Sequence, residues 1–503
     1  MPSASQLLVR SASAATLSAL WRLAVTFGTY LVLRRFIPPA EMGVWSWAEP
    51  LFLLLAQVRD LGVPGHVVRQ RERDYAGYLR LQVVWGGVLA LLLFAAAPLL
   101  ALLFEDRDAS TVPLLRLLCV FLFVQGLGSV PLTYFEAEQR IERTIPAELL
   151  RNAVFAALSL LLAWRGFGVW SIVVAYTVAG AAYSAMLWWW ALRRGAGDGD
   201  GSAGATLRVA RHGSGGSTRM LAAAAWPLMV MSLLENAVLH LDPLLLGLVD
   251  EEATAHASLT LFSLFFFSRL IADQVGRALY PALVVAHAQP AQSFELYRIA
   301  TLFLVTFVVP TSFFFFFNAR AAALVLGGPD WVPAGTYLTV AAFVPLVRPL
   351  TMFGREYMLV VHRDRLVNLY SLLNLISLGA LGWTLVHTEL GPLGMAVAGY
   401  FPLGVLVLAW GLHRIDSYAC RRLFRQLLGL YALGAVLFAP VVLLPAAWTW
   451  TRVAVCVAIA TLYVALGLVW HRDAYRRFWR GEAARDAAAG KASRTAAGSR
   501  STR

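Results

Sequence analysis

The sequence predicts an all-α integral membrane protein with about fourteen transmembrane helices. Hydrophobic residues make up 59% of its 503 residues and charged residues only 14%, whereas an ordinary soluble domain carries roughly 25% charge. The apolar runs are each about 20 residues long, which is the length that a helix needs to cross a bilayer. Strands of a membrane barrel would be about half as long and would alternate in polarity, so the sequence favours helices.

Charged or Gly/Pro-rich segments separate the apolar runs and set the expected helix boundaries. The first run follows the small-residue stretch 11–15, so we expect no removable signal peptide and a first helix that remains in the mature protein. In order, the expected helices are 12–33, 43–59, 80–104, 113–135, 147–164, 168–192, 221–249, 254–275, 298–320, 332–354, 366–386, 392–412, 426–445 and 450–470.

The basic residues behind the net charge of +13 fall between the apolar runs. We therefore read this charge as a topology signal and expect no nucleic-acid partner. Alternate connections are arginine-rich, and the others are short and mostly acidic, as at residues 250–252. The positive-inside rule places the arginine-rich set and both chain termini in the cytoplasm, with Arg34, Arg35 and Arg452 as exceptions on the outer side.

Residues 195–218 form a Gly/Ser-rich segment, which we read as a flexible cytoplasmic linker. The linker separates an N-terminal six-helix bundle from a C-terminal six-helix bundle. An additional helix pair and a basic tail, which we expect to be disordered, follow the second bundle. The four parts are residues 1–194, 219–414, 415–471 and 472–503.

The two bundles carry an internal sequence repeat. Pro131–Glu138 matches Pro349–Glu356 at five of eight positions. A constant shift of the first two helices of each bundle aligns Arg22 with Glu235, so aligned positions hold opposite charges. Because each copy has six helices, both copies start on the same side of the membrane, and the repeat is parallel.

Ionisable and polar residues inside the expected helices are the candidate functional residues, because a charge at membrane depth costs about 2.5–3.5 kcal/mol on insertion scales. If the bundles face each other, these residues can line one central cavity that holds an anionic head group. Arginine suits a phosphate because its planar guanidinium group forms two charge-assisted hydrogen bonds. The substrate-binding candidates are Arg22, Arg269, Arg348, Asn236 and His240. The candidates for ion coupling, or for pairing with these cations, are Glu49, Glu235 and Asp242.

Four acidic residues lie at the expected cytoplasmic ends of helices, beside arginine-rich loops. They can form structural salt bridges or gate latches, and both readings stay open. These residues are Asp60, Asp273, Glu138 and Glu356. Tryptophans near helix ends, including Trp45, Trp47 and Trp450, are expected to anchor the helices at the membrane surface.

Catalytic and metal-binding motifs are absent from the sequence. It has no HExxH motif, no Gly-rich phosphate loop, no GxSxG motif and no CxxC pair. The three cysteines are scattered through apolar segments, so they suggest neither a disulfide framework nor a metal site. We therefore expect a protein that is not an enzyme and that uses no cofactor or metal.

Three segments resemble the polysaccharide transporters of the MOP exporter superfamily. They are Leu33–Trp45, Arg59–Val63 and Gly166–Ser171. The resemblance implies a V-shaped pair of six-helix bundles that open alternately to the two sides of the membrane. It also implies that cationic residues hold a diphosphate and that an ion gradient can drive the cycle. The additional helix pair is similar to that of fourteen-helix members, in which it forms a groove for a lipid tail.

The resemblance further implies a flippase for an undecaprenyl-diphosphate-linked oligosaccharide, such as an O-antigen or exopolysaccharide repeat unit, in the cytoplasmic (inner) membrane of a bacterium. The implied partners are this substrate, membrane lipids, a polysaccharide polymerase and glycosyltransferases. A MATE-like cation-coupled drug antiporter and a lipid II flippase on the same fold remain alternatives. A membrane glycosyltransferase or polymerase is disfavoured because the expected outer loops are short.

Overall fold

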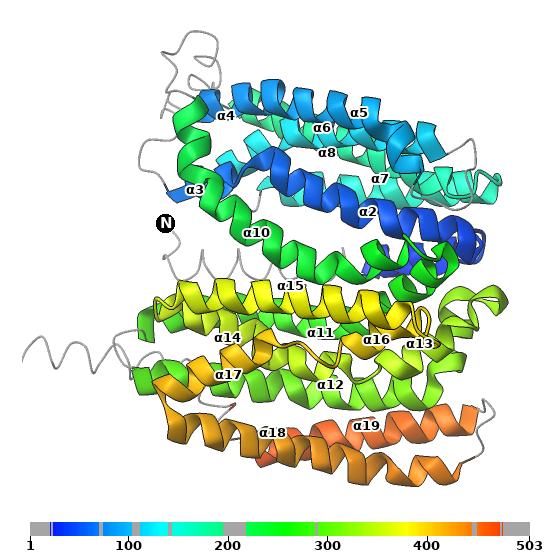
Figure 1. Ribbon diagram of the computed structural model, residues 1–503, viewed down its shortest axis with the longest axis vertical. Helices are drawn as coiled ribbons and strands as arrows, with labels where there is room; N and C mark the ends of the chain where they lie inside the picture. The colour runs from blue at the N-terminus through cyan, green and yellow to red at the C-terminus, as the bar shows by residue number, and fades with distance from the viewer. Residues whose placement is uncertain are drawn as a thin grey trace, which may run out of the picture. The chain divides into compact units, whose positions relative to one another are not determined.

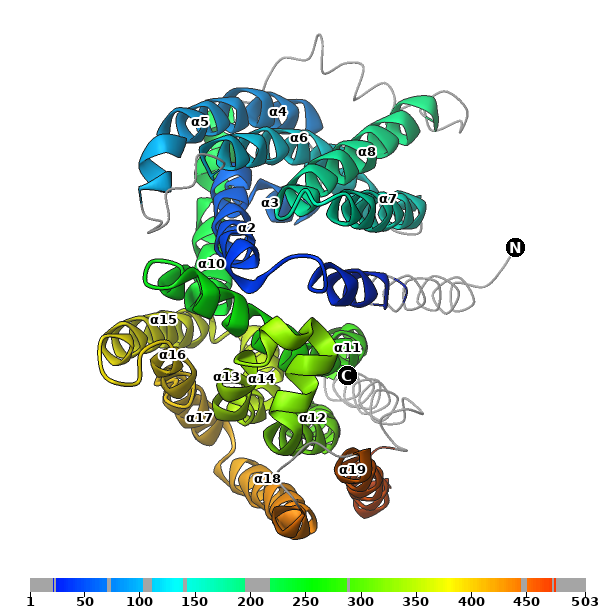
Figure 2. The same cartoon turned by 90° about the vertical axis from the view of Figure 1, so that its right-hand side faces the viewer.

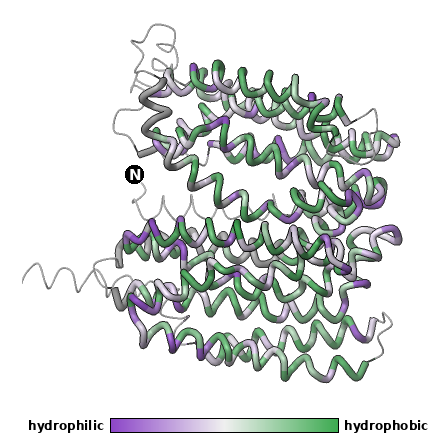
Figure 3. Tube along the Cα trace, in the orientation of Figure 1, coloured by the Kyte–Doolittle hydropathy of each residue, from purple (hydrophilic) through white to green (hydrophobic). Residues whose placement is uncertain are grey.

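The computed structural model describes a protein built from helices (Figure 1). The described residues are 21, 24–69, 74–102, 111–138, 143–194, 218–286, 290–444, 450–472 and 475. Within these ranges there is no β-strand, and nine helices are long and apolar enough to cross a membrane. Hydrophobic residues predominate along the helices, while hydrophilic residues gather at many helix ends (Figure 3). The predicted all-α membrane fold is confirmed, whereas the count of fourteen spans stays a prediction.

The chain divides into two compact units, residues 1–255 and 256–503. The first unit holds the first helix, whose apolar part is Ala24–Leu33, and then α2 (Pro39–Asp60), α3 (Val63–Arg69), α4 (Tyr75–Leu81), the π-helix η1 (Gln82–Gly86), α5 (Gly87–Ala101), α6 (Thr111–Ala137), α7 (Ile145–Trp164), α8 (Trp170–Arg194) and α10 (Thr218–Leu246). Helix α11 (Glu251–Ala286) runs from the first unit into the second. The linker proposed at 195–218 lies outside the described residues up to 217, so the predicted domain boundaries stay a prediction.

The second unit continues from α11 with eleven short and long elements. They are α12 (Pro290–Gly327), η3 (Pro329–Trp331), α13 (Ala334–Ala341), η4 (Val344–Val347), α14 (Arg348–Val360), α15 (Asp364–Val386), α16 (Leu393–Ala398), α17 (Gly404–Ile415), α18 (Ser417–Phe438), η5 (Ala439–Leu443) and α19 (Trp450–Trp470).

Helix α6 is the central helix of the first unit, because it packs against α2, α3, α5 and α8. Small residues let its neighbours approach closely, as in other membrane helix pairs. A Cβ built on Gly128 would lie 2.2 Å from the Ser184 hydroxyl of α8, and one on Gly180 of α8 would lie 2.6 Å from the Phe121 ring. Only glycine therefore fits at these two contacts.

A buried arginine at the end of α2 ties this helix to its neighbours. Arg59 is 2% exposed, and its guanidinium group donates to both carboxylate oxygens of Asp60, with Nε and Nη2 each 3.0 Å from an oxygen. Its Nη1 donates to the Leu122 carbonyl of α6 at 2.6 Å and to Gln125 Oε1 at 3.3 Å. Asp60 also accepts from Gln82 Nε2 at 2.9 Å. The charge pair is thereby satisfied by three helices.

Local backbone geometry brings these groups together. Helix α2 stops at Leu61, which has a left-handed φ of 50° and donates its N–H to the Gln57 carbonyl at 3.1 Å, and Gly62 follows with φ of 72°. The π-helix begins at Gln82, and such single-turn bulges shift the register of side chains within a helix. In the same turn, Trp85 Nε1 donates to the Val58 carbonyl of α2 at 3.1 Å.

Two expected helices of the second unit are interrupted at prolines. The single helix expected at 332–354 is instead α13, a 3-10 turn and α14, with Pro345 and Pro349 in the interrupted region. The helix expected at 392–412 is two pieces, α16 and α17, separated by a segment that contains Pro402. Proline lacks the N–H that a continuous helix requires. The span expected at 332–354 is present as the apolar span Ala334–Val360 with an internal interruption, whereas the expectation of a single helix at 392–412 is wrong.

The additional helix pair, α18 and α19, packs on α12 (Figure 2). Arg298 of α12 is 3% exposed, and its Nε donates to Glu295 Oε2 at 2.7 Å while its Nη1 donates to Gln426 Oε1 of α18 at 2.5 Å. Just beyond α19, burial and then the nearby charge of Arg298 lower the pKa of His471, so this imidazole is neutral at pH 7. The buried Arg298 therefore connects α12 to α18 within the second unit.

Gly126 of α6 packs directly on the Arg59 side chain, so we predict that Gly126→Ala destabilises the protein. A Cβ there would lie 2.6 Å from Gln82 Oε1 and 2.9 Å from Arg59 Cδ. Overpacking of this kind costs about 1–3 kcal/mol, which a thermal unfolding scan of the purified protein detects as a lower Tm. The matched control is Gly87→Ala, whose Cβ would meet only the Phe123 ring at an ordinary 3.6 Å. An unchanged or raised Tm for Gly126→Ala would contradict the packing described.

Candidate functional site

A polar cavity lies inside the first unit. Its volume is about 350 Å³, and helices α2, α6, α7 and α8 and the first helix contribute to its wall. Its lining residues are Thr26, Tyr30, Glu49, Arg59, Asp60, Phe121, Gln125, Gly128, Ser129, Leu132, Arg151, Asn152, Phe155, Tyr176, Ala179, Gly180 and Tyr183. Two carboxylates and two guanidinium groups therefore face one cavity among aromatic rings and hydroxyl groups.

Glu49 is the acidic residue in the middle of α2, and Pro50 follows it. Proline cannot donate to the carbonyl four residues earlier, so α2 lacks one backbone hydrogen bond beside this carboxylate. The Glu49 charge lies within electrostatic range of the hydroxyl groups of Tyr30 and Tyr176. The partly buried Glu49 thus shares its cavity with two tyrosine side chains.

Aromatic rings surround Tyr176 at the wall of the cavity. Its ring centroid lies 4.5 Å from that of Phe121 and 6.2 Å from that of Phe155. Trp45 makes an edge contact with Tyr176 at 5.1 Å, and its Nε1 donates to the Tyr30 hydroxyl at 3.2 Å. Aromatic rings thus form part of the cavity wall that Glu49 shares.

Trp45 and Trp47 correct an expectation from the sequence. Both were expected to anchor α2 at the membrane surface, but they are only 1% and 3% exposed. Trp47 Nε1 donates to the Leu244 carbonyl of α10 at 3.2 Å, so it joins two helices of the first unit. Trp450, in contrast, is 73% exposed at the start of α19, as an interfacial anchor would be.

Arg151 and Asn152 of α7 are cavity residues that the sequence reasoning missed. The Arg151 guanidinium lies 5.0 Å from the centroid of the Tyr183 ring. Asn152 is 8% exposed, and its side-chain amide donor has no hydrogen-bond acceptor among the described residues. Arg151 closely follows the basic loop at 140–143, so its sequence context is the same as that of a residue that only sets topology. A search for uncharged polar residues inside the expected helix would have found Asn152.

The two acidic residues of the cavity, Asp60 and Glu49, differ in their surroundings. Asp60 is already engaged by Arg59 and Gln82, so its charge is balanced within the structure. Glu49 lies nearer the start of α2, beside hydroxyl groups and aromatic rings. These groups can help the carboxylate to hold a small cation or a proton. Within the described part of the chain, no cluster of three or more His, Cys, Asp or Glu side chains is placed to hold a metal ion.

The remaining substrate-binding and coupling candidates are distributed as follows. Arg22 lies outside the described residues, and Glu235 on α10 and Arg269 on α11 are described only as helical positions. Arg348 is the first residue of α14 and lies within electrostatic range of Tyr370. Their convergence on one central cavity stays a prediction.

The polar face expected on α10 is helical throughout. Asn236 Nδ2 donates to the Ser232 carbonyl at 2.8 Å, which uses that donor within the helix. His240 and Asp242 follow on the same helix and are partly buried. Their roles in substrate binding and ion coupling stay predictions.

The four candidates for gates or salt bridges differ in their surroundings. Asp60 is held in the network of Arg59, while Glu138 is exposed just after the end of α6. Glu356 is partly buried on α14, and Asp273 is described only as a position on α11. For Asp60 the geometry fits a structural salt bridge, and a gate role for the other three stays a prediction.

Sequence comparison identifies the family of this chain. The profile of a family described as "Polysaccharide biosynthesis protein" matches residues 32–336, which include α2 to α12 and the whole cavity except Thr26 and Tyr30. The chain belongs to this polysaccharide biosynthesis protein family. The match confirms the resemblance that the segments at Leu33–Trp45, Arg59–Val63 and Gly166–Ser171 suggested.

A relative by sequence and two by structure agree with this membership. The succinoglycan biosynthesis transport protein ExoT of Rhizobium meliloti (strain 1021) is 25% identical over 171 residues, which cover 33% of this chain and 34% of that protein. The fold resembles the lipid II flippase MurJ in its inward closed conformation, with a TM-score of 0.69, 11% identity and coverage of 91% of this chain and 98% of that one.

The fold also resembles an inward-facing multidrug resistance MATE transporter of the MOP superfamily. The TM-score is 0.62 at 16% identity, with 79% of this chain and 95% of that chain covered. These relatives are all named as transport proteins or flippases, in agreement with the prediction that this chain is not an enzyme. This membrane protein therefore has the same fold as these two transport proteins.

The Arg59–Asp60 pair provides a test of its structural role. We predict that Asp60→Asn destabilises the protein by about 3–5 kcal/mol, because it leaves a buried guanidinium without its counter-charge. The double variant Arg59→Met/Asp60→Asn removes both charges and is expected to recover most of that loss. Thermal unfolding of the single and double variants measures the coupling.

Glu389→Gln, at an exposed acid in a loop, is the control, with an expected change within about 0.5 kcal/mol. If Asp60→Asn unfolds at the wild-type temperature while transport is lost, Asp60 acts as a gate and not as a structural partner of Arg59.

Proposed function

We propose that this protein is a flippase that moves an undecaprenyl-diphosphate-linked oligosaccharide from the inner to the outer leaflet of a bacterial cytoplasmic membrane. The observation that carries the proposal is the family match over residues 32–336. The resemblance to MurJ over 91% of the chain supports a fold suited to alternating access, and the partial match to a succinoglycan transport protein favours a polysaccharide precursor as cargo. The orientation that we propose has both termini in the cytoplasm.

The cargo requires cations for its diphosphate and a route for its lipid tail. We assign diphosphate binding to Arg22, Arg269 and Arg348, because arginine stays charged at every physiological pH and binds phosphate through two hydrogen bonds. Asn236 and His240 on α10 can bind sugar hydroxyl groups. Glu235 and Asp242 on the same helix are the proposed counter-charges while no cargo is bound.

We assign ion coupling to Glu49 in the cavity of the first unit. A carboxylate among aromatic rings is less well solvated than one in water, so it gains more from binding a proton or a small cation. Binding would neutralise Glu49 and change its interactions with α7 and α8, which share the cavity wall. The first unit then has two states, one with Glu49 charged and one with Glu49 neutralised by a bound ion. An ion gradient favours a different one of these states on each side of the membrane.

Membrane lipids surround the protein, and a polysaccharide polymerase and glycosyltransferases are its proposed partners at the two ends of the transport step. Glycosyltransferases would supply the lipid-linked unit on the cytoplasmic side, and the polymerase would consume it on the outer side. The MATE-like antiporter alternative requires binding of organic cations by the purified protein, which the same preparations can test.

A gene deletion tests the cargo. Cells without the gene are expected to accumulate the lipid-linked repeat unit on the inner leaflet and to lose the surface polysaccharide, and the wild-type gene should restore both. Arg348→Gln is expected to reduce restoration about tenfold or more, because a charge-assisted phosphate contact is lost. Arg363→Gln, at an exposed arginine before α15, is the matched control and should restore fully.

Normal surface polysaccharide in a clean deletion would contradict the flippase proposal. Full restoration by Arg348→Gln, with the deletion phenotype intact, would instead remove Arg348 from the diphosphate site and leave the proposed activity standing.

A further inference from the structure

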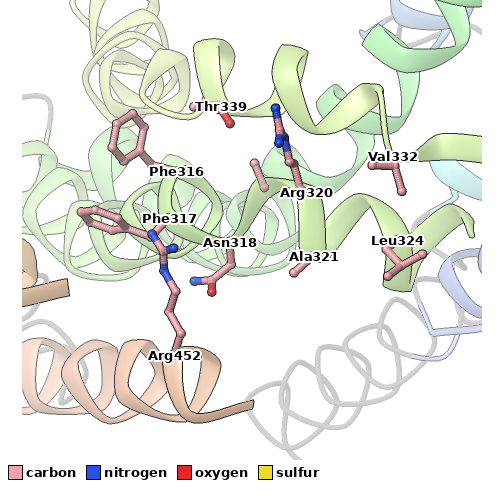
Figure 4. A pocket seen from close by; sticks show the side chains of 10 residues that line it. Phe316, Phe317, Asn318, Arg320, Ala321, Leu324, Val332, Thr339 and Arg452 are labelled. Atoms are coloured by element: carbon pink, nitrogen blue, oxygen red, sulfur yellow. The ribbon is translucent and has the colours of Figure 1, made fainter. Parts of the chain in front are cut away.

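A second pocket lies in the other unit, far along α12 from the end that carries Arg298. Its volume is about 460 Å³, and α12, α13 and α19 contribute to it (Figure 4). The described residues that line it are Phe316, Phe317, Asn318, Ala319, Arg320, Ala321, Leu324, Val332, Thr339 and Arg452. Two of these are arginines and none is acidic, so the lining carries a positive charge.

The two arginines come from segments far apart in the chain. Arg320 belongs to α12, and Arg452 is in the first turn of α19, in the additional helix pair. In the predicted orientation both lie on the outer side of the membrane, where the positive-inside rule disfavours arginine. Topology therefore does not explain why two cations share this pocket.

Each arginine is positioned by packing. The Arg452 guanidinium lies 5.8 Å from the centroid of the Phe317 ring, and Figure 4 shows this side chain reaching from α19 toward that ring. The backbone of Arg320 is fixed against Gly335 of α13, since a Cβ built on Gly335 would lie 2.7 Å from the Arg320 Cα, while the Arg320 side chain is exposed at the pocket. Packing thus positions the side chain of Arg452 and the backbone of Arg320.

A break in α12 opens the pocket between the two arginines. Asn318 has non-helical angles, φ of −122° and ψ of 21°, and the helix kinks there. Asn318 is 4% exposed, and its Nδ2 donates to the Phe314 carbonyl at 3.0 Å. No described group donates a well-formed hydrogen bond to its Oδ1, and the neighbouring Cys456 thiol is only a weak donor. A buried acceptor therefore remains under-satisfied in the pocket wall.

The expected depth of the pocket in the membrane favours a lipid head group as its ligand. Trp450, two residues before Arg452, is 73% exposed, and tryptophan at a helix end lies at the depth of the head groups. Phe316 is 38% exposed beside the pocket and offers an apolar surface to an acyl chain. A free phosphate would use the arginines but neither of these apolar side chains.

We propose that this pocket binds an anionic phospholipid whose head group carries hydroxyl groups, with phosphatidylglycerol as the probe. Arg452 and Arg320 attract the phosphate, and a head-group hydroxyl donates to the under-satisfied oxygen of Asn318. The bound lipid bridges α12 and α13 to α19, so it stabilises the attachment of the additional helix pair. This site is separate from the proposed cargo residues and does not depend on the cargo.

The test measures lipid binding to the purified full-length protein. Short-chain phosphatidylglycerol is expected to raise the Tm of the wild type and to remain bound in native mass spectrometry, whereas short-chain phosphatidylcholine and inorganic phosphate are not. Arg452→Gln and Arg320→Gln are each expected to weaken phosphatidylglycerol binding about tenfold or more. Arg452→Lys, which keeps the charge, should retain part of it.

Arg165→Gln is the matched control, because Arg165 is an exposed arginine over the ring of Trp164 at 5.5 Å and, in the predicted orientation, also lies on the outer side. A wild-type Tm without lipid shows that each variant folds. Unchanged phosphatidylglycerol binding in Arg452→Gln and Arg320→Gln, or equal loss in Arg165→Gln, would overturn the proposal. Binding of inorganic phosphate as tight as that of the lipid would overturn the lipid assignment.

Discussion

The first unit depends on a charged side chain that is buried inside a membrane-spanning bundle. Arg59 is 2% exposed, and a buried charge without partners costs several kcal/mol. Asp60, Gln125 and the Leu122 carbonyl accept its hydrogen bonds, so the helices that supply them must stay in register. The left-handed turn after α2, the π-helix and Gly126 all serve this one arrangement.

The second unit also contains a buried arginine that is paired with an acidic residue. Arg298 is also buried, and it pairs with an acidic residue one turn earlier and a glutamine on another helix, Glu295 and Gln426. In each unit, glutamine side chains connect the ion pair to other helices. They are Gln82 and Gln125 in the first unit and Gln426 in the second. Because both arginines are held by ion pairs and hydrogen bonds within the protein, we assign the proposed diphosphate site to other cations. In the first unit, Glu49 lines the same cavity as Arg59 and Asp60 and is the ion-coupling group that we propose.

The sequence predicted the class of the fold and part of the cavity. Helix length and hydropathy were sufficient for the all-α membrane architecture, and polarity at membrane depth identified Glu49. The interruption within 332–354 was not predicted because a proline such as Pro345 can bend a membrane helix without interrupting it, and the sequence does not distinguish the two outcomes. Arg151 was missed because a basic residue near a cytoplasmic loop has the same appearance in sequence whether it faces water or a cavity. Trp45 was misread for a related reason, since aromatic residues near helix ends serve both as anchors and as core.

Charge movement in reconstituted vesicles tests the central claim that Glu49 is the ion-coupling group of the first unit. Proteoliposomes on a solid-supported membrane are exposed to a proton or sodium concentration jump, and the transient current is recorded. The account predicts a current for the wild type and for Glu389→Gln, at an exposed acid in a loop, and its loss in Glu49→Gln. A Glu49→Gln current equal to that of the wild type would contradict the account.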